Sequence, residues 1–160
     1  MHTFLIIGKN FSGIRDKILS SGDEYFLLQD ILGTKYPNKR FKRRAVVDFS
    51  SKSAFLEAAE QFRGKVDGII CLYENYIVPA SQIAQTLELP GMPLASAEAC
   101  TDKDLMRELF SKAPAKISPD YMVVRSKAEL LSFAENHDFP LMLKPANLVK
   151  SLLITKNHDI

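Results

Sequence analysis

The sequence predicts an α/β fold, in which a Rossmann-like unit with a parallel sheet precedes a smaller, incomplete α+β piece. In the first ninety residues, short apolar runs alternate with segments of helical periodicity. This alternation is typical of parallel strands joined by right-handed crossover helices. All seven glycines lie at or before Gly91 and none lies in the last 69 residues, so the character of the chain changes there. Two apolar runs near the carboxyl end indicate an antiparallel pair of strands.

The first unit is expected to contain four strands and three helices. The strands are predicted over short apolar runs, namely 3–7, 25–29, 45–49 and 66–72. The helices are predicted where apolar residues recur at every third or fourth position, namely 10–21, 51–63 and 77–87. Apart from Asp67 and Gly68, the run 66–72 is apolar, as expected for a strand that is buried on both faces.

The second piece is expected to begin with a helix in "CTDKDLMRELFSKA", residues 100–113. Thr101 and Asp104 have the spacing of a capping box, with an acidic residue in place of the usual Glu or Gln. Four apolar residues would supply the buried face of this helix, namely Leu105, Met106, Leu109 and Phe110.

A strand, a second helix and the antiparallel pair are predicted to follow. The strand covers 119–124, the helix covers 127–136, and the pair consists of 140–143 and 151–154. We place a domain boundary near residues 91–96, which divides the chain into units 1–94 and 95–160. No further element follows to cover the antiparallel pair, so the second unit is expected to be unfinished.

Composition and charge indicate an ordinary soluble globular protein, with 46% hydrophobic and 25% charged residues. The longest apolar runs are far shorter than the ~20 residues that span a bilayer, and the first residues do not resemble a secretory signal. A cytoplasmic location without a membrane partner is therefore expected. Cys71 and Cys100 are far apart and have no metal-site spacing. Cys71 is expected to be an inert buried thiol, whereas Cys100 precedes a predicted helix start, where a lowered pKa is an alternative.

A basic segment, "KYPNKRFKRR" over 35–44, carries six of the 21 Lys and Arg residues. The simplest interpretation is a solvated loop between two strands, and a site for a small anion or a partner surface is an alternative. Nucleic acid is not expected as a partner because no recognition motif accompanies the charges. Arg43 and Arg44 precede the third strand and so are expected at the edge opposite the carboxyl ends. Only the part near Lys35 could overhang a site there.

Two glycines and one glutamate lie where parallel sheets bind ligands, at the carboxyl ends of strands. Gly8 and Gly13 in "GKNFSG" follow the first strand, but their spacing matches neither GxGxxG nor GxxxxGK[ST]. A structural turn is the simpler interpretation. A nicotinamide or flavin site is the alternative, for which Asp30 would be the only acid ending the second strand. Glu74 follows the fourth strand, and it either binds a substrate amine or simply begins the next helix.

Two lysines raise the question of a bound phosphate. Lys103 lies in the first turn of its predicted helix, where the helix dipole disfavours a cation by roughly 0.3–1 kcal/mol unless something compensates. Its neighbours Asp102 and Asp104 provide one compensation, and a bound phosphate would provide another. Lys144 ends the apolar run 140–143, immediately before Pro145. It either extends to water or contacts an anion.

The order of these motifs resembles that of the ATP-grasp superfamily of carboxylate–amine or carboxylate–thiol ligases. The similar segments are "IAQTLELPGMPLASAEACTDKDLMRELF" and, about thirty residues later, "FPLMLKPA". "TDKDLMR" and "PLMLKP", at this separation, are the most specific parts. In this family a Rossmann-like preATP-grasp domain precedes the nucleotide-binding domain, so the resemblance implies a preATP-grasp domain over 1–94 and the start of an ATP-grasp domain over 95–160.

The resemblance implies that Lys103 and Lys144 contact the phosphates of ATP, and that Lys150 and Ser151 of the following loop assist. It further implies that ATP and Mg²⁺ convert a small-molecule carboxylate into an acyl phosphate, which an amine or thiol then attacks. Two fixed ammonium groups suit that reaction, because charge builds on the transferred phosphoryl oxygens. Glu74 would belong to the substrate site. The resemblance is also compatible with a homodimer.

Two features differ from the family pattern. The loop after Lys144 is normally rich in glycine, yet "ANLVK" over 146–150 contains none. The family's second half, with its Glu and Asn metal ligands, does not fit within 160 residues, so we expect an amino-terminal fragment that is inactive alone. One alternative is a non-catalytic binding or regulatory module, which the glycine-free loop favours. Another is a dinucleotide-binding protein.

Overall fold

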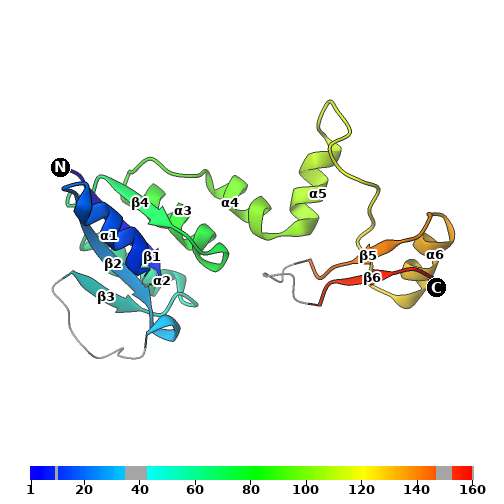
Figure 1. Ribbon diagram of the computed structural model, residues 1–160, viewed down its shortest axis with the longest axis horizontal. Coiled ribbons are helices and arrows are strands. Elements are labelled where there is room, and N and C mark those ends of the chain that lie inside the picture. Colours follow the sequence, from blue (N-terminus) through cyan, green and yellow to red (C-terminus); the bar gives the residue numbers. More distant parts are fainter. Residues whose placement is uncertain (10, 35–42, 147–152, 160) are drawn as a thin grey trace. The chain divides into compact units, whose positions relative to one another are not determined.

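The computed structural model describes residues 1–9, 11–34, 43–146 and 153–159, and Figure 1 shows its ribbon. The chain divides into two compact units, Met1–Glu98 and Ala99–Ile160. The first unit holds a four-stranded sheet with its helices, and the second holds helices and a two-stranded sheet. The α/β fold class predicted from the sequence is therefore confirmed.

The sheet of the first unit is fully parallel, in the order β3-β2-β1-β4. The central strand is β1, in which Ile6 pairs with Leu27 of β2 on one side and with Ile70 of β4 on the other. All four strands fall on the predicted apolar runs, with bounds Thr3–Gly8 for β1, Glu24–Asp30 for β2, Arg44–Val47 for β3 and Gly68–Cys71 for β4.

The connections of the first unit are helical, as the periodicity predicts. The α-helices are α1 (Ser12–Ser20), α2 (Lys52–Glu60) and α3 (Ile77–Thr86), and the 3₁₀ turns are η1 (Ile31–Gly33) and η2 (Glu74–Tyr76). A further helix, α4 (Leu94–Thr101), was not predicted. Its sequence, "LASAEACT", consists mostly of small residues, so it shows no clear apolar stripe.

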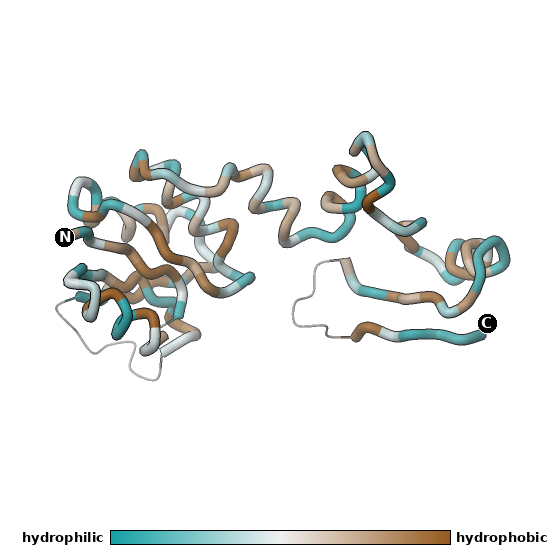
Figure 2. The backbone as a smooth tube through the Cα atoms, turned by 45° about the horizontal axis from the view of Figure 1, so that its top comes forward, coloured by the Kyte–Doolittle hydropathy of each residue, from teal (hydrophilic) through white to brown (hydrophobic). Residues whose placement is uncertain are grey.

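The core of the first unit covers both faces of the sheet. Leu5, Ile7 and Leu28 are at most 1% exposed and pack with Phe55 of α2 and Ile83 of α3. On the other face, a smaller cluster consists of Ile6, Ile18 and Leu27. Successive residues of β1 are thus buried on opposite faces, which explains why this strand is continuously apolar. In Figure 2 the most hydrophobic stretches of this unit run through its strands.

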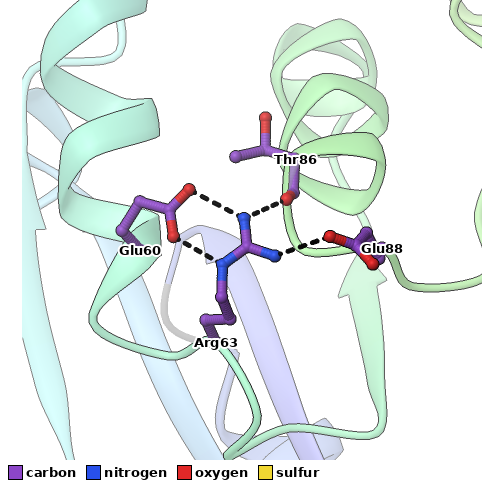
Figure 3. A network of polar contacts seen from close by, with 4 residues as sticks. All are labelled: Glu60, Arg63, Thr86 and Glu88. Atoms are coloured by element: carbon purple, nitrogen blue, oxygen red, sulfur yellow. Dashed lines mark hydrogen bonds and ion pairs between the residues drawn. The ribbon is translucent and has the colours of Figure 1, made fainter.

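Arg63 ties the ends of α2 and α3 together (Figure 3). Its guanidinium donates hydrogen bonds of 2.8 and 2.9 Å to the carboxylate of Glu60, and another of 3.1 Å to Glu88. It also donates to the backbone carbonyl of Thr86 at the end of α3. The hydrogen bond from Arg63 lowers the pKa of Glu60. The last carbonyl groups of a helix have no intrahelical partner, and Arg63 supplies one for the carbonyl of Thr86.

After the end of α4, the described residues of the second unit form two α-helices and one antiparallel pair, with bounds Lys103–Ser111 for α5, Lys127–Glu135 for α6, Leu141–Leu143 for β5 and Thr155–Asn157 for β6. The helix α6 begins with a complete capping box between Ser126 and Glu129. Among the residues described in this unit, Ala99 and Ala134 are the only buried hydrophobic ones. The extensive core of the first unit has no counterpart here.

Three predictions for the second unit are wrong. Residues 119–124 form no strand, because no neighbouring strand pairs with them. β5 pairs with β6 at Thr155–Asn157, with Leu141 opposite Asn157, and residues 153–154 of the predicted partner belong to no strand. The other two residues of that predicted strand, 151–152, lie outside the described residues. The apolar face of α5 is not buried, since Leu105 is 43% and Leu109 is 52% exposed.

The cap of α5 also differs from the prediction. The capping residue is Asp102, whose Oδ1 accepts hydrogen bonds from the backbone N–H groups of Asp104 at 2.8 Å and Leu105 at 3.1 Å. Thr101 instead ends α4. Aspartate is as effective an N-cap as serine or threonine. The cap can therefore move by one residue, from Thr101 to Asp102, without another capping side chain.

Candidate functional site

The first candidate site follows from the strand order of the parallel sheet. From β1 the chain adds β2 and β3 on one side, and it then returns to add β4 on the other side. The helix after β1, α1, packs on one face of the sheet, and the helix after β4, α3, packs on the other. Such a topological switch point opens a crevice at the carboxyl edge, where ligands of open parallel sheets bind.

Two charged residues flank this switch point. Lys9 follows β1, and its Nζ lies 5.4 Å from the centre of the Tyr73 ring, which follows β4. Glu74 comes next and begins η2, with an exposed side chain. Among the described residues its carboxylate forms no ion pair. Glu74 therefore begins a helical turn, as one interpretation expected, and it also presents a carboxylate at the edge where a ligand would bind.

Asp30, at the end of β2, is engaged within the protein. Its Oδ2 accepts a 2.6 Å hydrogen bond from the buried hydroxyl of Tyr76, and its Oδ1 accepts one from the backbone N–H of Leu32 at 3.2 Å. Burial, together with the Asp30 carboxylate, raises the pKa of Tyr76 well above its usual value. Asp30 thus serves the packing of η1 and η2, and a ribose hydroxyl would have to displace one of these bonds.

Gly8 has a structural role in the turn after β1. Its φ of +91° lies in the region that favours glycine, and a Cβ at this position would collide with the ring of Tyr76. In a dinucleotide-binding turn the backbone at this position would approach a phosphate, but at Gly8 the ring of Tyr76 lies there instead. This contact supports the structural-turn interpretation of "GKNFSG".

The arginines at the end of the basic segment have partners within the fold. Arg43 forms a 2.7 Å ion pair with Glu24 at the start of β2, which agrees with the expected amino-terminal edge. Arg44 donates 3.1 Å hydrogen bonds to Gln29 and Thr34. The remainder of the basic segment, including Lys35, lies outside the described residues.

The two cysteines lie in different surroundings. Cys71, at the end of β4, is half-buried, and burial raises the pKa of its thiol, as expected of an inert cysteine. Cys100 is exposed within the last turn of α4, and it comes shortly before the start of α5, as expected.

The second candidate site lies within the second unit, where Lys103 meets the segment after β5. Lys103 is the first residue of α5, as the sequence predicted. Its backbone N–H donates a 3.0 Å hydrogen bond to the carbonyl of Ala146, and its Nζ lies 3.4 Å from the same oxygen. Ala146 is two residues beyond Lys144, which follows β5. The fold thus brings together the two segments that carry the predicted phosphate-binding lysines.

Of the other predicted nucleotide contacts, only Lys144 is described. Its side chain is exposed and is therefore accessible to water or to an anion. Lys150 and Ser151 lie outside the described residues. The Ala146 carbonyl was missed by the sequence analysis, because every residue carries the same group and only the tertiary fold singles one out.

Within the ranges that the structure describes, no group of three or more His, Cys, Asp or Glu side chains could hold a metal ion. The same residues include no helix that is both long and apolar enough to cross a membrane.

The chain is homologous to ATP-grasp carboxylate–amine ligases and covers only the amino-terminal part of these enzymes. Among curated proteins it is 28% identical over 112 residues to a D-alanine–D-alanine ligase of Streptomyces avermitilis. This match covers 61% of the chain and 29% of the relative. A D-alanine–D-alanine ligase of Proteus mirabilis is 23% identical over 146 residues, which cover 86% of the chain and 40% of the relative.

Solved structures agree with this assignment of the fold. The L-amino acid ligase from Bacillus licheniformis matches with a TM-score of 0.75 and 20% identity, over 99% of this chain and 39% of its own. The phosphoribosylglycinamide synthetase from Anaerococcus prevotii matches with a TM-score of 0.66 over the same shares of the two chains. No family model matches the chain. The chain spans well under half the length of each of these relatives.

Proposed function

We propose that the chain is the amino-terminal part of an ATP-dependent ligase that activates a carboxylate as an acyl phosphate for attack by an amine or thiol. In this proposal residues 1–94 form the preATP-grasp domain and 95–160 begin the nucleotide-binding domain. The support is the homology to ligases together with the contact between Lys103 and the Ala146 carbonyl. A cytoplasmic location, where ATP is available, belongs to the same proposal.

The nucleotide would bind beside the start of α5. The amino end of a helix attracts phosphate through its dipole, and Lys103 adds a full positive charge there. The first N–H groups of α5 already donate to Ala146 and Asp102, so the dipole and the lysine side chains would supply the attraction. Lys144 adds a second charge from the strand end, and Lys150 and Ser151 would extend the site. Positive charge placed in advance stabilises the transferred phosphoryl group, because no reorganisation is needed as its charge develops.

Mg²⁺ would accompany ATP and neutralise its phosphates. The described residues contain no carboxylate cluster for it, and the proposal therefore assigns its protein ligands to the part of the ligase fold that the matches do not cover. We accordingly expect this chain alone to bind ATP without turning it over. A steady ATPase activity of the isolated chain that is lost in the Lys103→Met variant would contradict this expectation.

The substrate would be a small carboxylic acid, and the similarity to D-alanine–D-alanine ligases and to an L-amino acid ligase points to amino acids as the class. Glu74 would pair with the substrate amine at the switch point of the first unit. Its exposed carboxylate, without an ion-pair partner among the described residues, is the observation that supports this role.

The nucleotide site can be tested by titrating ATP into the intact chain by calorimetry or NMR. Lys103→Met and Lys144→Met should each weaken binding at least about tenfold, equivalent to about 1.4 kcal/mol. Lys127→Met is a matched control, because Lys127 is likewise the first residue of its helix, α6. Equal affinities in all four proteins would refute the nucleotide site.

A non-catalytic module that retains the fold is a second candidate, favoured by the glycine-free sequence "ANLVK". It would bind ATP without transferring phosphate even when joined to the rest of a ligase fold. A longer natural form of the protein that shows acyl phosphate formation, trapped as a hydroxamate by hydroxylamine, would exclude it.

A further inference from the structure

Lys9 is held in one position by residues that follow two other strands. A Cβ built on Gly33, which follows β2, would lie 3.3 Å from Cγ of Lys9, so the aliphatic part of the lysine packs closely over this glycine. Its ammonium lies 5.4 Å from the ring centre of Tyr73, which follows β4. A cation within about 6 Å of an aromatic face is attracted by the negative charge of the ring. Three loops thus fix one cation at the carboxyl edge.

The ring that holds Lys9 is itself anchored in the core. Tyr73 contacts Tyr76 edge to face at 6.5 Å, and Tyr76 contacts Phe49 in the same way at 5.2 Å. Tyr76 is also fixed by its hydrogen bond to Asp30. Lys9 is therefore more restricted than an ordinary surface lysine, and restriction before binding reduces the entropic cost of recognising a ligand.

Neither charge at the switch point is neutralised by the part of the chain that the structure describes. Lys9 has the ring of Tyr73 as its electrostatic partner, and Glu74 has no ion pair there. The two opposite charges follow β1 and β4, the strands between which the switch point lies. A ligand with both a carboxylate and an ammonium group would complement this arrangement, whereas an anion alone would leave Glu74 without a partner.

Exposed apolar side chains also follow strands that end at this edge of the sheet. Phe11, Leu32 and Leu72 are 46%, 87% and 49% exposed, and they follow β1, β2 and β4, respectively. All three connections leave the same edge of the parallel sheet. An apolar group on the ligand would find contacts here that the charged pair does not supply.

We propose that Lys9 and Glu74 together recognise a zwitterionic α-amino acid at the β1/β4 switch point, with Lys9 pairing with its carboxylate and Glu74 with its ammonium group. The inference deepens the proposed function and rests on it for the role of the bound molecule. Its new element is Lys9, held over Tyr73 and Gly33, as the residue that recognises the carboxylate.

The test is an NMR titration of the intact chain with L-alanine and D-alanine, without nucleotide, up to about 50 mM. Amide shifts should be confined to the loops after β1, β2 and β4. Lys9→Met and Glu74→Gln should each weaken binding of the preferred enantiomer at least about tenfold, a loss near the lower limit for a charged hydrogen bond. Lys65→Met is the control, because Lys65 precedes β4 and so lies toward the opposite edge.

Analogues of alanine that lack one charged group test the roles of Lys9 and Glu74 separately. Lactate lacks the ammonium group, so its weaker binding should depend on Lys9 and not on Glu74. Alanine amide lacks the carboxylate, so its binding should depend on Glu74 and not on Lys9. Gly33→Ala should weaken the binding of alanine and lactate but not of alanine amide, because the added methyl group would press against Cγ of Lys9.

Absence of shifts at the three loops, or binding unaffected by both charge variants, would overturn the inference. A titration with ATP is read at α5 and β5, on different residues. Loss of the ATP response with an intact alanine response would therefore remove the proposed nucleotide site alone, and the reverse result would remove the amino-acid site alone.

Discussion

The backbone N–H and the side-chain ammonium of Lys103 both face the carbonyl oxygen of Ala146, at 3.0 and 3.4 Å. The start of α5 is therefore joined to the end of the β5 segment across 43 positions of sequence. An N–H group at a helix start has no intrahelical partner, and here a carbonyl from the segment after β5 supplies one. Four predictions concern this contact and the packing of the first unit.

Lys103→Met should loosen the segment around Ala146 while leaving the backbone hydrogen bond in place. The ammonium contact is lost, and only the N–H donor remains. Hydrogen exchange followed by mass spectrometry should show faster exchange of peptides covering 141–146. Lys127→Met, at the start of α6, should leave these peptides unchanged, and equal acceleration in both variants would show that the contact has no specific effect.

Tyr76→Phe should lower the free energy of unfolding by about 1–3 kcal/mol, because it leaves the buried carboxylate of Asp30 without its hydroxyl donor. Tyr73→Phe is the matched control. No hydrogen bond of the Tyr73 hydroxyl is found among the described residues, so the change should stay within about 0.5 kcal/mol. Chemical denaturation of the three proteins measures the difference, and equal losses in both variants would contradict a special role for the Asp30 contact.

The stabilising effect of the Tyr76 hydroxyl should decline at high pH. The pKa of Tyr76 is raised in the folded protein, so the neutral phenol is favoured there relative to the unfolded chain. This contribution is complete below the ordinary tyrosine pKa of about 10 and diminishes as the pH rises above it. The difference in stability between the natural protein and Tyr76→Phe should therefore narrow between about pH 9.5 and 11. A constant difference would contradict the raised pKa.

Arg63→Met should lower the melting temperature by roughly 2–4 °C. The variant loses the hydrogen bonds to Glu60 and Glu88 and the contact with the Thr86 carbonyl that ends α3 (Figure 3). Glu88→Gln keeps the contacts with Glu60 and Thr86, so its effect in differential scanning fluorimetry should be smaller. An equal or larger effect of Glu88→Gln would indicate that the exposed ion pair dominates.

The parallel sheet could be predicted from sequence because its strands are buried on both faces. Every residue of the segment from Leu5 to Ile7 is apolar and buried, so the pattern does not depend on register. The antiparallel pair was harder to predict from the sequence. The strand that pairs with β5 is the polar β6, Thr155–Asn157, whereas the prediction placed that strand at the apolar run directly before β6. Hydrophobicity marks a strand well only where a core surrounds it.

The site residues also differ in how far the sequence alone identifies them. Lys103 and Lys144 were identified from motifs whose order along the chain is informative. Lys9 stands within "GKNFSG" but was not predicted as a site residue, because only the spacing of the glycines in this segment can be compared with known motifs. Its significance depends on the ring of Tyr73, which is 64 positions away and is brought close only by the pairing of β1 with β4.

The uneven burial of the two units has a calorimetric consequence. Unfolding changes the heat capacity by about 12–15 cal/mol/K per residue in a protein whose whole chain is packed. For 160 such residues the increment would be roughly 1.9–2.4 kcal/mol/K. Buried apolar side chains are concentrated in Met1–Glu98, which alone would yield roughly 1.2–1.5 kcal/mol/K. Differential scanning calorimetry should therefore return the heat-capacity increment of a domain of about one hundred residues.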